Sequence, residues 1–473
     1  MLMLLSLLPP IVGALIVFHM EDNEKRHRFT AATVICTAVL AVGAAFLSML
    51  REFPSEITLL HLDDTLTLSF GADGLSLFFI ALVSFIWCFV QFHAFGYMKH
   101  EGNEGQFFGF FLLTYASLIA LAFAKNAVTF YMCFEFMSLS SMPLVLHNGT
   151  EKSRMAAFKY LGYSTLGALM ALMGFFLLGA QGNDLTFTPG GAGLVGDPKI
   201  LLAAAFLIVL GFGAKAGMVP LQMWLTEAHP VAPSPASAVL SGLITKAGVL
   251  AIIRCTWVQT AVLVLAIVTI FTGSMLAQRE KILKKRMAYS TVSNVSYVIF
   301  GLFVMDEVGL GVVGAFLQIV FHALAKDALF LCAGSVIFAT GKTRVDELRG
   351  IGRRMPVTMW CFAIASLSLI GIPPMGGFAA KWYLALGALD AGSTLSLVGV
   401  IVLMVSALLT AFYLLPIVSA AFFPGRDYEA GESCEVPKTM LVPQILFAGL
   451  TVLLGMFPNM LTAFTAILDG WLL

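Results

Sequence analysis

Long apolar segments recur along the whole chain, and they constrain its fold more than any other feature. A helix that crosses a bilayer needs about 20 mostly apolar residues. Hydrophobic residues make up 59% of the chain and charged residues only 11%, whereas roughly a quarter of the residues of a soluble domain are charged. We therefore predict an all-α polytopic membrane protein with about 14 transmembrane helices. The predicted spans are residues 2–19, 30–50, 75–98, 107–124, 126–146, 155–180, 200–226, 236–257, 258–277, 288–304, 309–340, 357–389, 394–423 and 439–469.

Three of these segments need a separate comment. No basic residue precedes the apolar residues of MLMLLSLLPPIVGALIVFHM, and the charges follow it. This order is typical of a first transmembrane helix and not of a cleaved signal peptide. The eleventh and twelfth segments are longer than a single crossing needs, so we expect a break inside each of them.

The composition also excludes several classes of function. The formal net charge is +0, so the chain has no basic surface for a nucleic acid. The 7 cysteines lie mostly in apolar segments without a CxxC pair, which is typical of small buried hydrophobic residues. The sequence contains no phosphate-binding loop and no nucleophile elbow. We expect no cofactor, no metal site and no catalytic residue in this chain.

Basic residues are distributed unevenly between alternate loops. With fourteen spans, the loops after odd-numbered spans hold 18 of the 27 lysines and arginines, and the loops after even-numbered spans hold four. Cytoplasmic loops carry the excess of basic residues in membrane proteins. The sequence therefore predicts a multi-pass protein of the plasma (inner) membrane with both termini on the non-cytoplasmic side.

Several ionisable residues lie within the predicted spans and not in the loops. A charge at the centre of a bilayer costs at least about 2.5–3.5 kcal/mol on insertion scales, so such residues mark ion paths or buried pairs. The lysines of this set are Lys159, Lys215, Lys246, Lys326 and Lys381, and the acids are Glu135 and Asp327.

Each of these groups has a structural and a functional interpretation. Glu135 lies near the middle of its span, where it either pairs with a lysine or carries protons, and a pair would serve both. Lys159 lies near the end of its span and can reach water, which favours a structural role. His322 and Lys326 share one helix face, which favours a relay over a lone core histidine. Asp327 points about 100° away from Lys326 and is equally consistent with neutralising a lysine on a neighbouring helix.

Two predicted spans combine a lysine with a helix break. In GAKAGMVP, Lys215 precedes Gly217 and Pro220, and proline removes a backbone donor from a helix. In GIPPMGGFAAK, Lys381 follows two prolines and two glycines. Lys246 lies instead in an otherwise uninterrupted apolar helix, which argues against a chance surface charge. Interrupted helices at corresponding positions of two halves indicate the transport site of an inverted-repeat transporter.

The two breaks are five spans apart, and this spacing predicts how the chain is divided. The halves share no convincing side-chain identity, so the repeat is inferred from the topology alone. We expect inverted five-helix repeats at residues 107–257 and 258–423. Helices 1–3 precede them in residues 1–106, and helix 14 follows in residues 424–473.

Three stretches of the sequence resemble a known family. They are GAKAGMVPLQMWLTEAHPVAPSPASAVLSGLITKAG, FHALAKDALF and IGIPPMGGFAAKWY. They are similar to the antiporter-like membrane subunits of respiratory complex I, of Mrp-type Na+/H+ antiporters and of energy-converting membrane-bound hydrogenases, and the similarity covers nearly the whole chain. The resemblance implies fourteen helices with two inverted five-helix units and broken helices 7 and 12.

The resemblance also implies a proton pathway through five helices. In the family, a glutamate on helix 5 pairs with a lysine on helix 7, and groups on helices 8, 11 and 12 carry the proton to the exit. The matching pathway residues here are Glu135, Lys215, Lys246, His322, Lys326 and Lys381, and the accessory candidates are Lys159, His229 and Asp327.

The function that this resemblance implies is proton translocation within a multisubunit membrane complex. Partner subunits would supply the energy, since no redox centre is expected in this chain. The lysine at position 381 and the FHALAKDALF stretch are more similar to Mrp and hydrogenase subunits, and no long lateral helix is expected after helix 14. The expected transported ion is H+, and Na+ is a further candidate. The alternatives are a proton-pumping subunit of an NADH-quinone oxidoreductase, an independent secondary transporter of a solute and a purely structural scaffold. Whether the complex is an enzyme depends on these partners.

Overall fold

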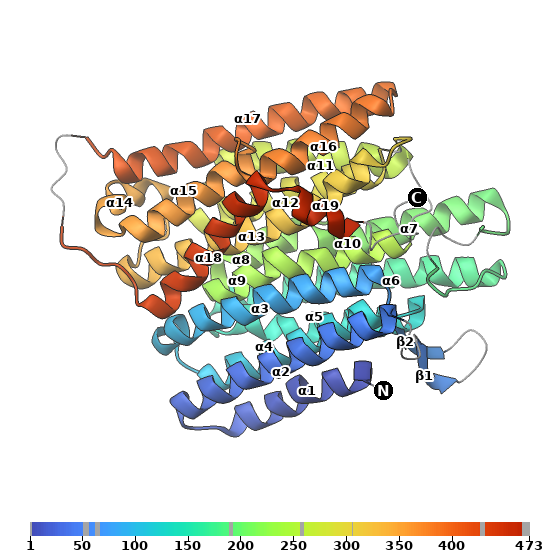
Figure 1. Cartoon of the computed structure of the whole chain (residues 1–473), viewed down its shortest axis with the longest axis horizontal. Helices are drawn as coiled ribbons and strands as arrows, with labels where there is room; N and C mark the ends of the chain where they lie inside the picture. The colour runs from blue at the N-terminus through green and yellow to red at the C-terminus, as the bar shows by residue number, and fades with distance from the viewer. Residues whose placement is uncertain are drawn as a thin grey trace.

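The structure is a bundle of helices with one small β-hairpin. The computed structural model describes residues 2–50, 56–61, 67–188, 193–255, 260–304, 306–425 and 431–465. The helices lie side by side with their long axes roughly aligned; α1 and α2 lie at one edge and α17 lies at the other (Figure 1). The antiparallel strands of the hairpin are β1 (Glu56–His61) and β2 (Thr67–Gly71).

The first half of the chain forms helices whose starts are often capped by short polar side chains. Asp22, Asp73, Asn126 and Thr150 each accept a hydrogen bond from a backbone N–H of the helix that follows, which satisfies donors that a helix start leaves free. The helices are α1 (Leu2–His19), α2 (Asn23–Met49), α3 (Gly74–Glu101), α4 (Glu104–Phe123), α5 (Ala127–Leu146), α6 (Glu151–Ala180), α7 (Pro198–Ala216), α8 (Met223–Val231), α9 (Ser234–Val239), the π-helix η1 (Leu240–Ile244) and α10 (Thr245–Arg254).

The second half continues the bundle. The helices are α11 (Thr260–Arg279), α12 (Leu283–Leu302), α13 (Leu310–Thr340), the 3-10 helix η2 (Val345–Leu348), α14 (Ile351–Arg354), α15 (Pro356–Ile370), α16 (Gly376–Asp390), α17 (Thr394–Phe422), α18 (Lys438–Met456) and α19 (Asn459–Thr465). Two helices, α15 and α16, follow each other along one predicted span.

Within the described residues, all fourteen predicted spans fall on helices; residues 256–259, at the end of the eighth span and the start of the ninth, and residues 466–469 of the fourteenth lie outside these residues. Within the described ranges, 12 helices are long and apolar enough to cross a membrane, counting α9, η1 and α10 as one. The remaining two predicted spans fall on α12, which begins with several basic residues, and on the pair α15 and α16. The polytopic all-α fold is therefore confirmed, while the division into two inverted repeats stays a prediction.

Two details of the helices differ from the sequence expectation. The expected break in the eleventh segment is wrong, because α13 is continuous over 31 residues. Its length is accommodated by packing against α3, α9, α12, α15, α16 and α18. The eighth span is not uninterrupted as expected, because η1 gives it a π-helical turn just before Lys246. The expected break in the twelfth segment is confirmed at residues 371–375, between α15 and α16.

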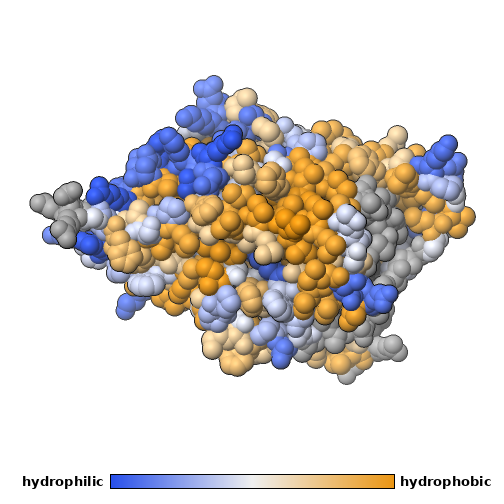
Figure 2. Space-filling view, turned by 90° about the horizontal axis from the view of Figure 1, so that it is seen from above, coloured by the Kyte–Doolittle hydropathy of each residue, from blue (hydrophilic) through white to orange (hydrophobic). Residues whose placement is uncertain are grey.

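Burial separates inner from outer helices. The apolar windows of α13 and of the α9–η1–α10 helix are 100% buried, whereas that of α17 is only 28% buried. Figure 2 shows a broad apolar area across the middle of one face, with hydrophilic groups toward its ends. The outer helices thus present an apolar surface suited to lipid or to other membrane subunits. The charged candidates at positions 246, 322, 326 and 327 lie on the two innermost spans.

One buried ion pair ties the N-terminal helices to the rest of the bundle. Arg254, at the end of α10, donates hydrogen bonds to both carboxylate oxygens of Asp73 and to Ser76 Oγ at the start of α3. Burial alone would raise the pKa of the Asp73 carboxyl, but the Arg254 guanidinium and the hydrogen bonds from Ser76 bring this pKa below its ordinary value. The pair therefore links the start of α3 to the end of α10.

We predict that Asp73→Ala lowers the thermal midpoint of the detergent-solubilised protein. The change leaves the Arg254 side chain, which is 1% exposed, without its carboxylate, and removing one partner of a buried pair costs about 3–5 kcal/mol. The measurement is the loss of the monodisperse peak of a tagged chain in size-exclusion chromatography after heating.

The matched control is Glu56→Ala, which removes the partner of Lys125. The Glu56 side chain is 55% exposed, and exposed pairs contribute only about 0–1 kcal/mol. Equal midpoints for the two variants would contradict a stabilising role of the Asp73–Arg254 pair.

Candidate functional site

The candidate pathway residues are mostly deep inside the bundle. The side chains of Lys215, Lys246, His322 and Lys326 are no more than 1% exposed, and Lys381 is 7% exposed. The accessory candidates His229 and Asp327 are both fully buried. Lys159 differs, because it is exposed and pairs with Glu227 at 3.4 Å. This surface position agrees with the structural interpretation of Lys159.

The first helix break holds Lys215 in the last turn of α7. Gly217, with φ 82°, ends this helix in the left-handed conformation that favours glycine. The Trp224 indole N–H of α8 donates to the carbonyl of Ala214 at 2.7 Å. The two half-helices are thus joined across the break by a side chain, and the lysine lies directly at the junction.

Three hydroxyl groups bind the Lys215 ammonium. Its Nζ donates to Ser138 Oγ at 2.9 Å, to Tyr160 OH at 2.8 Å and to Ser164 Oγ at 3.0 Å. It also lies 4.2 Å from the centroid of the Tyr160 ring, within cation–π range. An ammonium has three donors, so neutral oxygens from α5 and α6 satisfy all of them.

The structure does not show the expected ion pair of Glu135 and Lys215. Glu135 lies one helical turn before Ser138 on α5, and its buried Oε1 has no hydrogen-bond partner among the described residues. The pair is open because the three hydroxyls occupy the ammonium. Glu135 is nonetheless close to Lys215 along α5, because Ser138, which binds Lys215, is only one helical turn away from Glu135.

The π-helical turn η1 provides a hydrogen-bond acceptor for the side chain of Lys246. The Ser241 carbonyl in this turn accepts hydrogen bonds from Thr245 Oγ1 at 2.7 Å and from Lys246 Nζ at 2.9 Å. Short π-helical segments are frequent at functional sites because they interrupt the regular hydrogen-bond pattern. The same Nζ lies 2.5 Å from His322 Nδ1 on α13. The structure therefore brings the predicted helix 8 and helix 11 groups into direct contact.

Two further titratable groups on α13 lie around this contact. Lys326 Nζ donates to the Met287 carbonyl of α12 at 2.8 Å. Neither carboxylate oxygen of Asp327 has a hydrogen-bond partner among the described residues, and the carboxylate lies against Gly242 of η1, where a Cβ would come within 2.2 Å of Oδ2. Asp327 therefore lies against the π-helical turn that precedes Lys246 and forms no ion pair with this lysine.

The second helix break holds Lys381 in a different way. α15 ends before Gly371, with φ 89°, and Lys381 belongs to the following half-helix α16. Its Nζ donates to the carbonyls of Leu369 at 2.6 Å and Ile370 at 2.8 Å. These are terminal carbonyls of α15, where the helix dipole favours a positive charge. The lysine thus binds the end of one half-helix while lying on the other.

Sequence reasoning missed two features of this site. The sequence shows the hydroxyl cluster around Lys215 only as Ser138 in FMSLSS and as Tyr160 and Ser164 in FKYLGYS, and such residues are common in membrane helices. Lys284 was assigned to a loop, but it is buried at the start of α12 and donates to the carbonyl of Ala232. Its neighbours Lys285 and Arg286 led to this assignment, because a cluster of basic residues is typical of a loop.

Comparisons with known proteins agree with this architecture. The profile "NADH:quinone oxidoreductase/Mrp antiporter, TM" matches residues 124–410, and "NADH-Ubiquinone oxidoreductase (complex I), chain 5 N-terminus" matches residues 61–108. The first match alone covers more than half of the chain. The chain belongs to the NADH:quinone oxidoreductase/Mrp antiporter family.

Members of this family from different complexes are similar to the chain. NADH-quinone oxidoreductase subunit N of Desulforudis audaxviator is 32% identical, over 91% of both chains. Hydrogenase-4 component B of Escherichia coli is 32% identical over 82% of this chain and 62% of its own length. A chain in the Mrp complex of Dietzia sp. has the same fold, with a TM-score of 0.83 at 19% identity, covering 98% of this chain and 96% of that one.

We predict that Gly377→Ala disrupts the second break. A Cβ at Gly377 would lie 1.8 Å from the Ser368 carbonyl oxygen, so α15 and α16 would have to move apart and Lys381 would lose its carbonyl partners. We expect a lower yield of monodisperse protein and a lower thermal midpoint than for the parent chain. Gly43→Ala on α2 is the control, because nothing lies within 4 Å of the added Cβ. A Gly377→Ala chain as stable as Gly43→Ala would contradict the close approach.

Proposed function

We propose that the chain is a proton-translocating, antiporter-like subunit of a multisubunit membrane complex. The contact between Lys246 Nζ and His322 Nδ1, at 2.5 Å, carries the proposal. An ammonium is only a donor, so this contact requires either a bare ring nitrogen or a neutral amine. The two groups therefore share one transferable proton inside an apolar core, and this is what a proton relay needs.

The remaining pathway residues extend this relay across the bundle. Lys326 lies one helical turn from His322 on the same face of α13, and Lys381 lies at the second break on α16, which packs against α13. We propose that protons pass from Lys246 through His322 and Lys326 toward Lys381. Water would bridge the gaps between these groups, since irregular backbone at membrane depth is tolerated where it lines a hydrated cavity.

Glu135 and Lys215 are proposed as the control element of this path. In the open arrangement, hydroxyl groups bind Lys215 and its positive charge is not neutralised. If Lys215 moves to Glu135, the pair neutralises this charge, and a pair 4 Å apart at an effective dielectric constant of 20 is worth about 4 kcal/mol. Opening and closing the pair would thus change how strongly the field near Lys215 repels a proton on Lys246.

The energy for this cycle would come from partner subunits. Relatives at equal identity come from a quinone oxidoreductase and from a hydrogenase, and a chain with the same fold belongs to an Mrp complex. The proposal is therefore the shared role of an antiporter-like subunit, with H+ as the transported ion and Na+ as an additional ion in an Mrp-like complex. The subunits that co-purify with a tagged chain will identify the complex.

An independent transporter of a solute is less consistent with the two breaks. Such a protein needs free polar groups at the breaks to bind its substrate. At the first break the ammonium of Lys215 is bound by three hydroxyls, and at the second break that of Lys381 is bound by two carbonyls. Both ammonium groups are therefore already bound by groups of this chain, which favours the proton path over a solute site.

We predict that Lys246→Ala and Glu135→Gln each stop proton transport without preventing assembly. Lys246→Ala removes a group that carries the proton, and Glu135→Gln removes the carboxylate that controls the proton affinity of this group. A positioned proton-transfer group contributes at least about a hundredfold to a rate. Transport is measured as quenching of an acridine dye in everted membrane vesicles from cells that express the chain with its partners.

Lys199→Ala is the matched control, because it removes the same charge from an exposed position at the start of α7. Assembly is checked by co-purification of the partner subunits. The scheme is wrong if Lys246→Ala and Glu135→Gln both transport protons at the rate of the Lys199→Ala control.

A further inference from the structure

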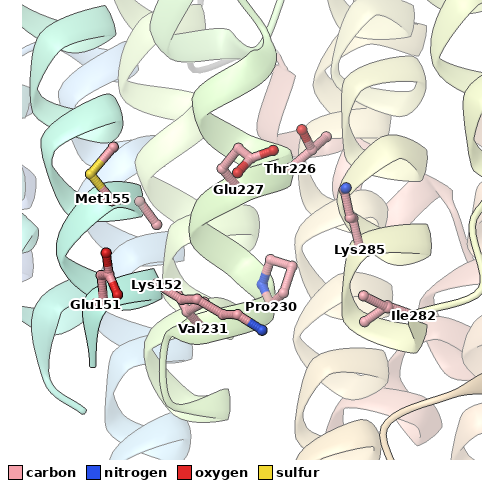
Figure 3. A pocket seen from close by; sticks show the side chains of 10 residues that line it. Glu151, Lys152, Met155, Thr226, Glu227, Pro230, Val231, Ile282 and Lys285 are labelled. Carbon is pink, nitrogen blue, oxygen red and sulfur yellow. The ribbon is translucent and has the colours of Figure 1, made fainter. Parts of the chain in front are cut away.

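A solvent-facing pocket lies between the ends of three helices. Its volume is about 540 Å³, and it is formed by the start of α6, the end of α8 and the start of α12. Figure 3 shows Glu227 and Thr226 of α8 facing Lys285 across this pocket. The basic loops predict that this side of the membrane is cytoplasmic. The pocket therefore opens the end of α8 and the start of α12 to solvent.

Lys284 lies in the wall of this pocket but faces the interior. Its sequence neighbours Ile282 and Lys285 line the pocket, whereas the Lys284 side chain is 4% exposed. Its Nζ donates to the carbonyl of Ala232, at the break where α8 ends and α9 begins. Lys284 is therefore a buried lysine that lies beside a solvent-facing pocket and at a helix break.

His229 lies on the inner side of the same wall. Pro230 and Glu227 of its helix line the pocket, but the His229 side chain is fully buried, and neither ring nitrogen has a hydrogen-bond partner among the described residues. Its ring stacks on Phe330 of α13 at 4.7 Å. A buried imidazole with two unpartnered nitrogens costs free energy, and a relay histidine is the group that uses both nitrogens in turn.

These two residues connect the pocket to the proposed path. Lys284 binds the carbonyl of Ala232, three residues after His229. Phe330, on which His229 stacks, is one turn beyond Lys326 on α13. Lys326 in turn donates to the carbonyl of Met287, one turn beyond Lys284 on α12. These contacts thus connect the end of α8 with the start of α12 and with the turn of α13 that holds Lys326.

We propose that Lys284 and His229 form the entry of the proton path. A hydronium ion in the pocket gives a proton to the neutral amine of Lys284 and becomes water. Lys284 passes this proton to one ring nitrogen of His229, and His229 releases a proton from its other nitrogen to the neutral amine of Lys326. One proton reaches Lys326 for each proton taken from the pocket, and only O–H and N–H bonds change. The inference rests on the proposed function: from Lys326 the proton moves through His322 to Lys246, which stores it, and it later returns through the same groups toward Lys381.

The test compares variants in the dye-quenching assay on everted vesicles that contain the assembled complex. Lys284→Ala and His229→Phe should each lower the initial rate of proton transport at least about fivefold, because each removes a proton-transfer group. Phenylalanine keeps an aromatic ring against Phe330. Lys281→Ala is the control: it removes the same charge from an exposed residue and should leave the rate unchanged.

Lys284→Arg separates a relay from a purely structural contact. Arginine keeps a positive donor for the Ala232 carbonyl but does not release its proton in proteins. A relay predicts that transport by Lys284→Arg stays impaired, whereas a parental rate would show that Lys284 only caps the carbonyl and would overturn the inference. If this variant does not assemble, His229→Phe decides, and a parental rate for it also overturns the inference.

Lys246→Ala, measured in parallel, separates this inference from the proposed function. If Lys246→Ala transports protons normally, the proposed function itself is wrong. If Lys246→Ala stops transport while Lys284→Ala or His229→Phe transports at the parental rate, protons reach the path elsewhere and only the entry fails.

Discussion

The rest of the structure depends on one constraint: buried lysine ammonium groups must be bound inside the bundle, and neutral groups bind them instead of carboxylates. Among the described residues, each buried lysine of the path donates to neutral oxygens or to a neutral nitrogen. Lys215 donates to hydroxyls, and Lys246, Lys326, Lys381 and Lys284 donate to backbone carbonyls. A carboxylate at each site would hold its proton tightly and would become an unpaired charge once the lysine was neutral. Neutral partners stabilise the charge enough for burial and still allow the proton to leave.

Irregular backbone supplies many of these oxygens. A regular helix uses its carbonyls internally, whereas helix ends leave them free. The end of α15 provides two carbonyls for Lys381, the π-helical turn provides Ser241 for Lys246, and the end of α8 provides Ala232 for Lys284. The breaks are therefore not simple hinges. Each one places a partner for a positive charge at a depth where side-chain acids would be costly.

Much of this was predictable from the sequence, and the rest was not for physical reasons. The lengths of the apolar segments predict the positions of the spans. The cost of burying a charge in a membrane is enough to identify Lys215, Lys246 and Lys381 as candidates. The break before α16 was visible in its prolines and glycines. In contrast, the π-helical turn before Lys246 was not predicted, because LSGLI resembles the small and apolar residues of the other spans.

The hydrogen-bond partners and the orientation of the buried side chains were also not predictable from the sequence. The pairing of Glu135 with Lys215 was expected from the resemblance, yet nothing in the sequence indicates that Ser138, Tyr160 and Ser164 converge on the ammonium. Lys284 shows the same limit, since periodicity cannot say which member of a basic cluster faces inward. The contact of Lys246 with His322 joins residues 76 positions apart, and only the packing of α9 and η1 against α13 brings them together.

The position of Lys381 has a mechanical consequence. Its ammonium holds the end of α15 from a place on α16, so this one side chain bridges the two half-helices. A charged group at the end of a helix is worth about 0.3–1 kcal/mol, and up to about 2 kcal/mol when it is partly buried. When the proton leaves, most of this attraction is lost and the joint loosens. By reciprocity, a neighbouring subunit that bends this joint would change how tightly Lys381 holds its proton, so a conformational change at this joint and the protonation state of Lys381 would each affect the other.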